Sequence, residues 1–234
     1  NYAFQYCSNL TNITIPSSVI NLGYDKKHNP FEYCEKLESY NVEENNSKYF
    51  SFDGILYDKY NNVLDIPINK RGHLIFNDMM ISIFYNLMQY SKKVTSVTFG
   101  KNLISICSNS FANCENLESV IMQDKVELID YYAFSNCYNL KTVVLSKNLQ
   151  TINNNSFAFC YNLTIVNYTG TKNFSSSINA FYNCTELKSI NVMEDFEYDS
   201  FCGIDVSKNI VFVPEISSSL NEEHCSMIFV KFSI

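Results

Sequence analysis

Apolar residues recur along this chain at fixed distances from a repeated block, Phe-x-x-Cys-x-x-Leu, in which the Phe follows Ala, Ser or Pro. The last four of these Phe residues are separated by 23, 23 and 24 positions. A constant period in this range is typical of a solenoid, in which each repeat forms one turn of a stack. The pattern therefore predicts one solenoid rather than two compact domains. The block occurs around Phe4, Phe31, Phe111, Phe134, Phe157 and Phe181.

Each repeat also predicts its own elements, because apolar residues fall at offsets −8, −5, 0, +6, +9 and +11 from the Phe. The alternation at the end of segment 140–145 predicts a short strand with one buried face, and stacked strands of this kind form a parallel sheet with about 4.8 Å between neighbours. Val126 and Ile129 predict a second short extended segment, and Ala-Phe-x-x-Cys predicts a tight turn or a single helical turn. The fold class is thus an α/β or β-rich solenoid, a right-handed superhelix of short parallel strands.

The same offsets reveal a repeat that lacks the block. Counting back 23 residues from Phe111 reaches Met88, and Ser91 stands where the Cys belongs. Apolar residues fill the remaining offsets, namely Met80, Ile83, Val94, Val97 and Phe99. The predicted count is therefore about seven repeats of about 23 residues.

An insertion interrupts the period between Phe31 and Met88. These residues are 57 positions apart, which is one period of 23 plus an excursion of 34. Two apolar runs, 49–57 and 63–67, flank a turn that contains two Asn residues. This pattern predicts a β-hairpin at about 47–68 that stands off the solenoid.

The register decays beyond residue 193, although 210–214 and 227–230 still have the apolar character of strands. We interpret 1–193 as the solenoid and 194–234 as a degenerate repeat followed by a cap or a continuation. Because the chain opens inside a repeat at Asn1, we expect it to be a piece of a longer protein.

The repeated block extends to Ala-Phe-x-x-Cys-x-x-Leu-x-x-Val-x-Ile and is combined with an Asp-Gly-Ile-Leu-Tyr insertion at 53–57. Together these motifs resemble the BspA-like, or Treponema pallidum-type, leucine-rich repeat family over roughly residues 1–193. The bias toward Asn, Tyr and Ser further resembles family members of parasitic protists, so we expect a protist origin. Members are implicated in adhesion to host cells and matrix proteins, which the resemblance implies and the spacing does not show.

Charge and hydropathy narrow the classes of partner. The formal net charge is −7 and the 17 Lys and Arg residues are scattered without clusters, so we expect no nucleic-acid binding. No apolar run approaches the roughly 18 residues that a membrane span needs. The chain is therefore expected to contain no membrane span.

Candidate chemistry is sparse. His28, His73 and His224 are remote from one another in sequence, and no Cys pair has ligand spacing beyond the repeat itself, so no metal site is expected. No nucleophile motif, phosphate loop or dinucleotide fingerprint appears, and we expect no catalytic residues and no cofactor. Six of the nine Cys residues share the +3 offset. This regularity predicts that they fill a small buried slot as reduced thiols.

One candidate partner site lies on the exposed face of the predicted strands, at offsets +7, +8 and +10. These columns are mostly Thr, Ser and Asn, with scattered charges, but Ile121 and Val144 are neighbours in the +10 column and Ile165 lies beside them in the +8 column. Apolar side chains that point outward on successive rungs mark a partner site. The alternative is that β-branched residues merely suit strands.

The second candidate surface is the insertion, which is rich in aromatic residues. Aromatic side chains are favoured anchors at protein interfaces. The alternative is that these rings pack on the adjacent rungs. The candidates are Tyr49, Phe50, Phe52, Tyr57 and Tyr60.

These observations predict a non-enzymatic protein-interaction module or structural scaffold, and we consider it a candidate part of a larger assembly. The sequence does not name its protein partner. An adhesin at the cell surface is the alternative that the family resemblance implies, and an enzyme is the third class, for which the columns supply no convergent titratable groups. The compartment is cytoplasm or cytoskeleton if the lack of an export signal is real. It is the cell surface or the exterior if the chain is a piece of a typical family member.

Overall fold

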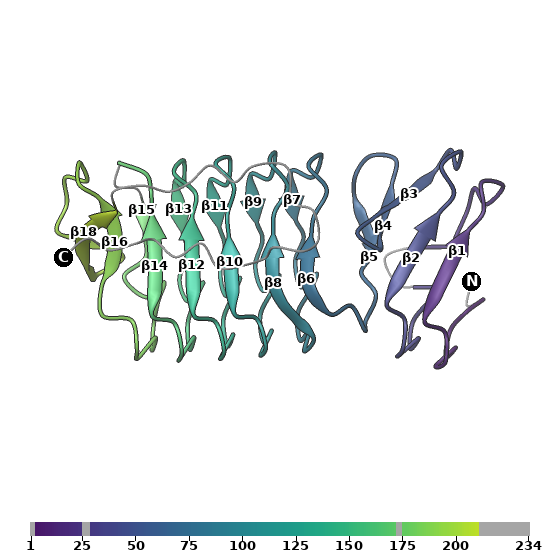
Figure 1. The fold of residues 1–234 in the computed structure, drawn as a ribbon, viewed down its shortest axis with the longest axis horizontal. Coiled ribbons are helices and arrows are strands. Elements are labelled where there is room, and N and C mark those ends of the chain that lie inside the picture. The colour runs from purple at the N-terminus through teal and green to yellow at the C-terminus, as the bar shows by residue number, and fades with distance from the viewer. Residues whose placement is uncertain (1–2, 25–28, 172–174, 211–234) are drawn as a thin grey trace.

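The chain forms a β-solenoid of about seven turns, which confirms the predicted fold class (Figure 1). The computed structural model describes residues 3–24, 29–171 and 175–210. No residue of these ranges is helical, so the solenoid is β-rich and the Ala-Phe-x-x-Cys segments are turns rather than helical turns.

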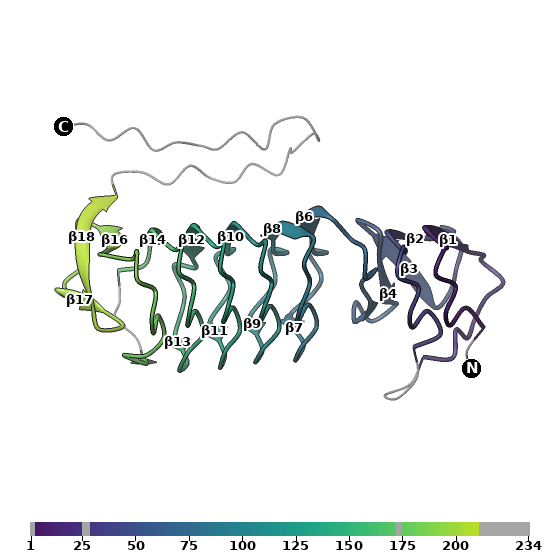
Figure 2. The ribbon, with the colours of Figure 1, turned by 90° about the horizontal axis from the view of Figure 1, so that it is seen from below.

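The larger sheet runs along one side of the solenoid and has the order β17-β18-β16-β14-β12-β10-β8-β6 (Figures 1 and 2). From β6 to β16 its neighbours are parallel, and register partners such as Val120 and Val143 are one period apart. We call it the major sheet. Its parallel strands are β6 (Gly72–Ile75), β8 (Val94–Thr98), β10 (Ser119–Ile121), β12 (Thr142–Leu145), β14 (Ile165–Tyr168), β16 (Ile190–Met193) and β18 (Ile204–Ile210).

The second predicted extended segment forms a smaller parallel sheet on the opposite side of the coil, in the order β15-β13-β11-β9-β7 (Figure 2). We call it the minor sheet. Each strand has two residues, and in β7, β9, β11 and β13 the second residue, such as Ile129, is buried in the core. The strands are β7 (Ser82–Ile83), β9 (Ser105–Ile106), β11 (Leu128–Ile129), β13 (Thr151–Ile152) and β15 (Ser175–Ser176).

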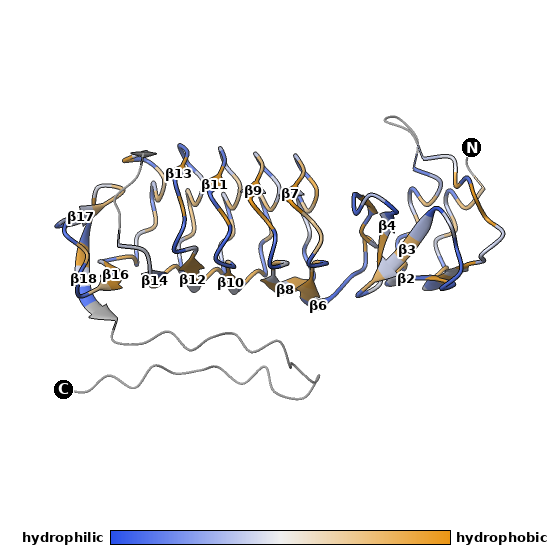
Figure 3. Cartoon of the chain, turned by 90° about the horizontal axis from the view of Figure 1, so that it is seen from above, coloured by the Kyte–Doolittle hydropathy of each residue, from blue (hydrophilic) through white to orange (hydrophobic). Residues whose placement is uncertain are grey.

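Identical side chains stack on one another between the two sheets, and hydropathy alternates in the same way along successive coils (Figure 3). The rings of Phe111, Phe134 and Phe157 lie 5.1 and 5.0 Å apart and are nearly parallel. The Cys at +3 donates from its thiol to the Phe carbonyl of the preceding rung, as Cys137 does to Phe111 at 3.2 Å. The +3 position therefore favours a small side chain that can donate a hydrogen bond. Burial raises the pKa of the Cys160 thiol.

The turns explain why Asn recurs at two positions of the rung. The residue two positions after the Phe has a positive φ in each rung that carries the block, and so does the residue two positions before it in several rungs. Asn tolerates this left-handed conformation better than most side chains. Asn fills such positions at 86, 109, 113, 136, 155 and 183.

Met88 occupies the Phe position of a rung, as predicted. Its N–H donates to the carbonyl of Ser110 at 2.7 Å, and its carbonyl accepts from the Cys114 thiol at 3.1 Å. These are the contacts that the Phe residues make in neighbouring rungs. The register alone was enough to locate this rung.

The insertion differs from the prediction in two ways. It is a three-stranded antiparallel meander, β3 (Tyr49–Phe52), β4 (Ile55–Asp58) and β5 (Val63–Asp65), with an additional turn at Asp53 and Gly54. It also does not stand off, because it lies in line between β2 (Ser39–Val42) and β6 (Figure 1). We call residues 49–65 the meander.

Both faces of β4, the central strand of the meander, are buried, which is why the meander stays in line with the stack. Leu56 packs in the N-terminal core cluster, with Phe31 and Tyr40. Ile55 and Tyr57 pack in the larger cluster that runs to the other end of the described chain. The meander therefore divides the core into two clusters. The first cluster also underlies β1 (Asn12–Ile15), which pairs in parallel with β2.

The far end of the major sheet carries a hairpin that resembles the first hairpin of the meander. β17 (Ser200–Phe201) turns back onto β18 through Cys202 and Gly203, both with positive φ, as Asp53 and Gly54 have. The pattern Tyr-x-Ser-Phe-x-Gly-Ile occurs at 49–55 and again at 198–204. The division at residue 193 stays a prediction, and residues 211–234 of the predicted cap lie outside the described ranges.

Candidate interaction surface

The structure brings the predicted apolar residues of the outward face together. Ile121 and Val144 are direct register partners on β10 and β12. Ile165 pairs with Thr142, two residues before Val144, and its side chain is 42% exposed. All three point away from the core, since their strand neighbours Val120, Val143 and Val166 are buried.

The same column contains one residue that sequence reasoning missed. Ile75 on β6 pairs with Thr98, which in turn pairs with Ile121. β6 belongs to the rung whose Phe block is replaced by the meander, so no motif marked it. Counting back one period from Thr98 would have found it. We call Ile75, Ile121, Val144 and Ile165 the apolar strip.

Polar groups bound the apolar strip. At one end the Asn191 side-chain amide donates to Asn167 at 2.8 Å, and on the +7 column Lys141 pairs with Glu118 at 3.0 Å. An apolar centre with a hydrogen-bonded polar rim is the usual composition of a protein interface.

His73 lies in the +8 column beside the strip. Its Nδ1 is 2.6 Å from the Ser96 hydroxyl and its Nε2 is 3.1 Å from the Thr98 hydroxyl. Burial lowers the pKa of His73, and Lys70 acts in the same direction while Asp53 opposes it. A neutral ring held between two hydroxyls has a structural role in the sheet.

The aromatic residues of the insertion divide into two groups, and the prediction for Tyr57 is corrected. Tyr57 is fully buried, its hydroxyl accepts from the N–H of Asn77 at 3.3 Å, and a partner cannot reach it. Phe50 stacks on Tyr57 at 4.9 Å, and the Tyr49 hydroxyl accepts from the N–H of Leu22 at 3.1 Å. These three rings fit the packing alternative.

Phe52 and Tyr60 remain at the surface of the insertion. Their side chains are 40% and 85% exposed. No contact in the structure shows what they bind, so their role as partner anchors stays a prediction.

A buried polar cluster ties the insertion to the first rungs. The hydroxyls of Tyr24 and Tyr40 both donate to the Asp65 carboxylate, Tyr24 at 3.2 Å. Burial raises the pKa of Asp65, although these hydrogen bonds and one from Asn29 oppose the shift. Burial and the nearby Asp65 charge raise the pKa of both tyrosines. The cluster is enclosed by structural partners, and sequence reasoning did not find it because Asp65 follows no motif.

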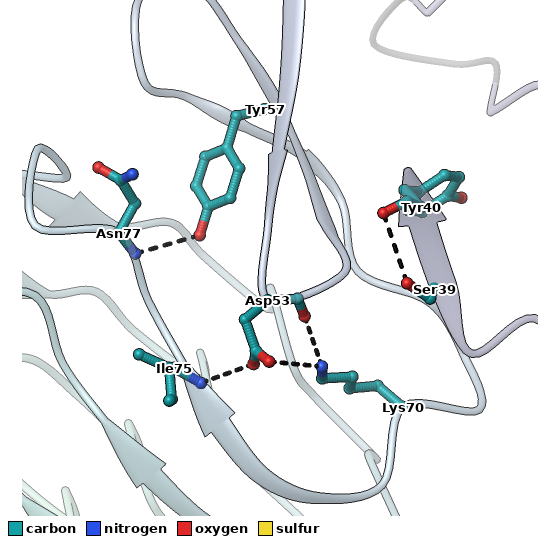
Figure 4. A network of polar contacts seen from close by, with 7 residues as sticks. All are labelled: Ser39, Tyr40, Asp53, Tyr57, Lys70, Ile75 and Asn77. Carbon is teal, nitrogen blue, oxygen red and sulfur yellow. Dashed lines mark hydrogen bonds and ion pairs between the residues drawn. The ribbon is translucent and has the colours of Figure 1, made fainter. Parts of the chain in front are cut away.

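Side chains of the meander replace backbone pairing at the adjacent edge of β6 (Figure 4). The Asp53 carboxylate accepts from the N–H of Ile75 at 3.0 Å and pairs with Lys70 at 3.1 Å. Gly54 is required beside it, because its φ is +70° and a Cβ there would lie 2.7 Å from the Ser39 hydroxyl. The turn at Asp53 and Gly54 therefore connects the meander to β6 of the major sheet.

The part of the chain that the structure describes offers little inorganic or redox chemistry. No group of three His, Cys, Asp or Glu side chains within it is arranged to hold a metal ion. The eight Cys residues in that part are free thiols. Among the same residues, no helix is long and apolar enough to cross a membrane.

A family model described as the BspA type leucine rich repeat region matches the chain in six copies, over residues 1–82 and 81–205. The chain belongs to this BspA-type leucine-rich repeat family. No curated protein sequence matches it detectably. The resemblance inferred from the Phe-x-x-Cys-x-x-Leu block is thus confirmed, whereas the protist origin stays a prediction.

Several solved structures share the fold. A cell surface protein of Faecalibacterium prausnitzii is 24% identical, with a TM-score of 0.58 over 78% of this chain and 48% of that one. A protein of Eubacterium ventriosum is 22% identical, with a TM-score of 0.56 over 77% and 48%. The pneumococcal vaccine antigen PcpA is 21% identical, with a TM-score of 0.56 over 81% and 47%. The chain thus spans about half the length of these structures, and the likeness concerns the fold alone.

Proposed function

We propose that this chain is a non-enzymatic protein-interaction module that binds a protein partner through the outward face of the major sheet. The observation that carries the proposal is the apolar strip, in which Ile121 and Val144 are register partners on a face that otherwise carries mostly hydroxyl and amide side chains with scattered charges. Burial of exposed apolar neighbours against a partner is favourable, and the strands already hold these side chains in position before binding.

The test replaces the centre of the strip by charge. The double variant Ile121→Asp and Val144→Asp is compared with Thr11→Asp and Asn12→Asp, which adds the same charge to the same kind of face on the first rung. Proteins captured from native extract by the unaltered chain should be lost with the first variant and retained with the control. Equal capture by both, with thermal unfolding unchanged, would exclude the strip as the binding surface.

A cell-surface adhesin is the more specific candidate. The family resemblance supports it, and one structure with the same fold is described as a cell surface protein. An intracellular scaffold attached to cytoskeletal filaments is the competing role. Antibody labelling of intact and permeabilised cells separates them, because an adhesin is labelled before permeabilisation and a scaffold only after it.

A further inference from the structure

Backbone groups on the minor-sheet side of the solenoid follow one pairing rule from rung to rung. The N–H groups of Ile104 and Cys107 donate back to the carbonyls of Ile81 and Ile83. In the following turn the direction reverses, and the carbonyl of Ser110 accepts from the N–H of the preceding rung. Each rung thus offers donors and then acceptors to the rung before it.

The Met88 rung has no such neighbour on its N-terminal side. The meander stands in the place of the preceding half rung, and its hydrogen bonds to the following rung involve Ile75 and Asn77, on the major-sheet side. Under this rule, six backbone groups of the Met88 rung would pair with a preceding rung, namely the N–H groups of Ile81, Ser82 and Phe84 and the carbonyls of Tyr85, Leu87 and Gln89. None of the described residues pairs with these groups. We call residues 81–89 the open edge.

Two side chains at the open edge are apolar and exposed. Ile81 is 64% exposed, and its counterparts in the next three rungs are Ile104, which is 43% exposed, Glu127 and Gln150. Phe84 is 42% exposed, and its counterparts in the next two rungs are Cys107 and Asp130. Exposed apolar side chains therefore accompany the unpaired backbone at this rung boundary.

We propose that the open edge binds a segment of another polypeptide by β-strand addition that continues through the following turn. Three donors followed by three acceptors, spaced along a strand and a turn, are complemented by a second backbone of the same shape. Ile81 and Phe84 favour apolar side chains on that segment, and the need for N–H donors opposite the three carbonyls excludes Pro at those positions. This site is separate from the apolar strip and stands whether or not the strip binds a partner.

A peptide of residues 127–136 is a suitable probe because its parent segment plays the missing role inside this protein. The carbonyls of Glu127 and Ile129 accept from the next rung, and the N–H groups of Phe134 and Asn136 donate to it. A control peptide carries Pro in place of both Phe134 and Asn136, which removes those two donors. Binding is followed by amide hydrogen exchange on the full chain.

The first peptide should bind saturably and slow exchange at the amides of Ile81, Ser82 and Phe84. The variant Ile81→Lys should weaken binding by about tenfold or more. The matched variant Gln150→Lys, in the same column but with its N–H bonded to Glu127, should leave binding unchanged.

Four results would overturn the proposal. These are no saturation at about 1 mM peptide, equal binding of the Pro peptide, protection only at other amides, or open-edge amides that are protected in the free chain. If that last protection rises with protein concentration, the edge is filled by a second copy. If it does not, the edge is covered within the chain.

Discussion

Asp53 accepts a hydrogen bond from the backbone N–H of Ile75 at 3.0 Å, although Asp53 lies in the turn between β3 and β4 and Ile75 lies on β6, a strand of another sheet. Elsewhere in the major sheet, an N–H in this position meets the carbonyl of a neighbouring strand. Here the strand is missing, because β2 and β6 are not paired. The Asp53 carboxylate, which also pairs with Lys70, is thus one of the contacts that bridge the break in the major sheet.

Replacing Asp53 by Ala should destabilise the chain by about 1–3 kcal/mol, since it leaves the Ile75 N–H without its partner and the Lys70 ammonium with only the backbone carbonyl of residue 53. Ala also suits the positive φ of 49° poorly. Asp53→Asn is the matched variant, because Asn tolerates this φ and retains an acceptor for Ile75. Its loss should be smaller. Urea unfolding measures both, and equal stability of the Ala variant and the unaltered chain would contradict the bridging role.

The thiols should differ in reactivity according to their place in the rung. Cys34, Cys137 and Cys160 are buried and donate to carbonyls, whereas Cys7 and Cys107 are half-buried. Because thiol reagents need an accessible thiolate, native protein should be labelled first at Cys7 and Cys107. Mass spectrometry after brief alkylation reads the sites directly. Uniform labelling of the six +3 residues without denaturant would show that the Cys ladder is not part of the core.

The contacts of a residue can be predicted from the sequence where its offset in the repeat determines them. Met88 could be located because every rung makes the same contacts, so one offset predicts them all. The insertion could not, since Ile55-Leu56-Tyr57 is a continuous apolar run and does not reveal that alternate residues serve two different cores. Asp53-Gly54 was a recognisable two-residue hairpin turn, and it would have predicted the third strand.

The candidate sites could likewise be predicted only where the repeat relates their residues to one another. Ile121 and Val144 follow from the register, but the partners of Asp65 lie 25 and 41 residues away in sequence, at Tyr40 and Tyr24, with no repeat to relate them. The open edge also has no motif of its own. It exists because the meander replaces half a rung, which only the three-dimensional arrangement reveals.

Stability should fall as the pH decreases below about 6.5, in part through His73. Burial lowers its folded pKa below the usual 6.5, so the unfolded chain takes up a proton at a pH where the folded chain does not. Asp65 acts in the opposite sense at lower pH, because its folded pKa is raised and the folded chain binds the proton more tightly.

The variant His73→Gln isolates the first effect. Its amide can still bond Ser96 and Thr98 but does not titrate, and the contribution of Asp65 is the same in both proteins. The difference in unfolding free energy between the unaltered chain and the variant should therefore shrink as the pH falls from about 8 to 5. A difference that stays constant over this range would show that His73 has the same pKa in the folded and unfolded chain.

The two related hairpins should tolerate opposite substitutions. Leu56 on β4 is fully buried against the N-terminal core, whereas Asp205, at the same place in the second Tyr-x-Ser-Phe-x-Gly-Ile hairpin, is exposed on β18. Leu56→Ala should cost about 2–5 kcal/mol through the lost contacts and the cavity, and Leu56→Asp more, because it also buries a charge. Asp205→Leu should change the unfolding free energy by less than about 0.5 kcal/mol, as exposed substitutions usually do. Chemical denaturation tests each variant, and sedimentation tests whether the new apolar residue causes self-association. A large loss of stability in Asp205→Leu would mean that the outer face of β18 is covered, and that the second hairpin has two buried faces like the first.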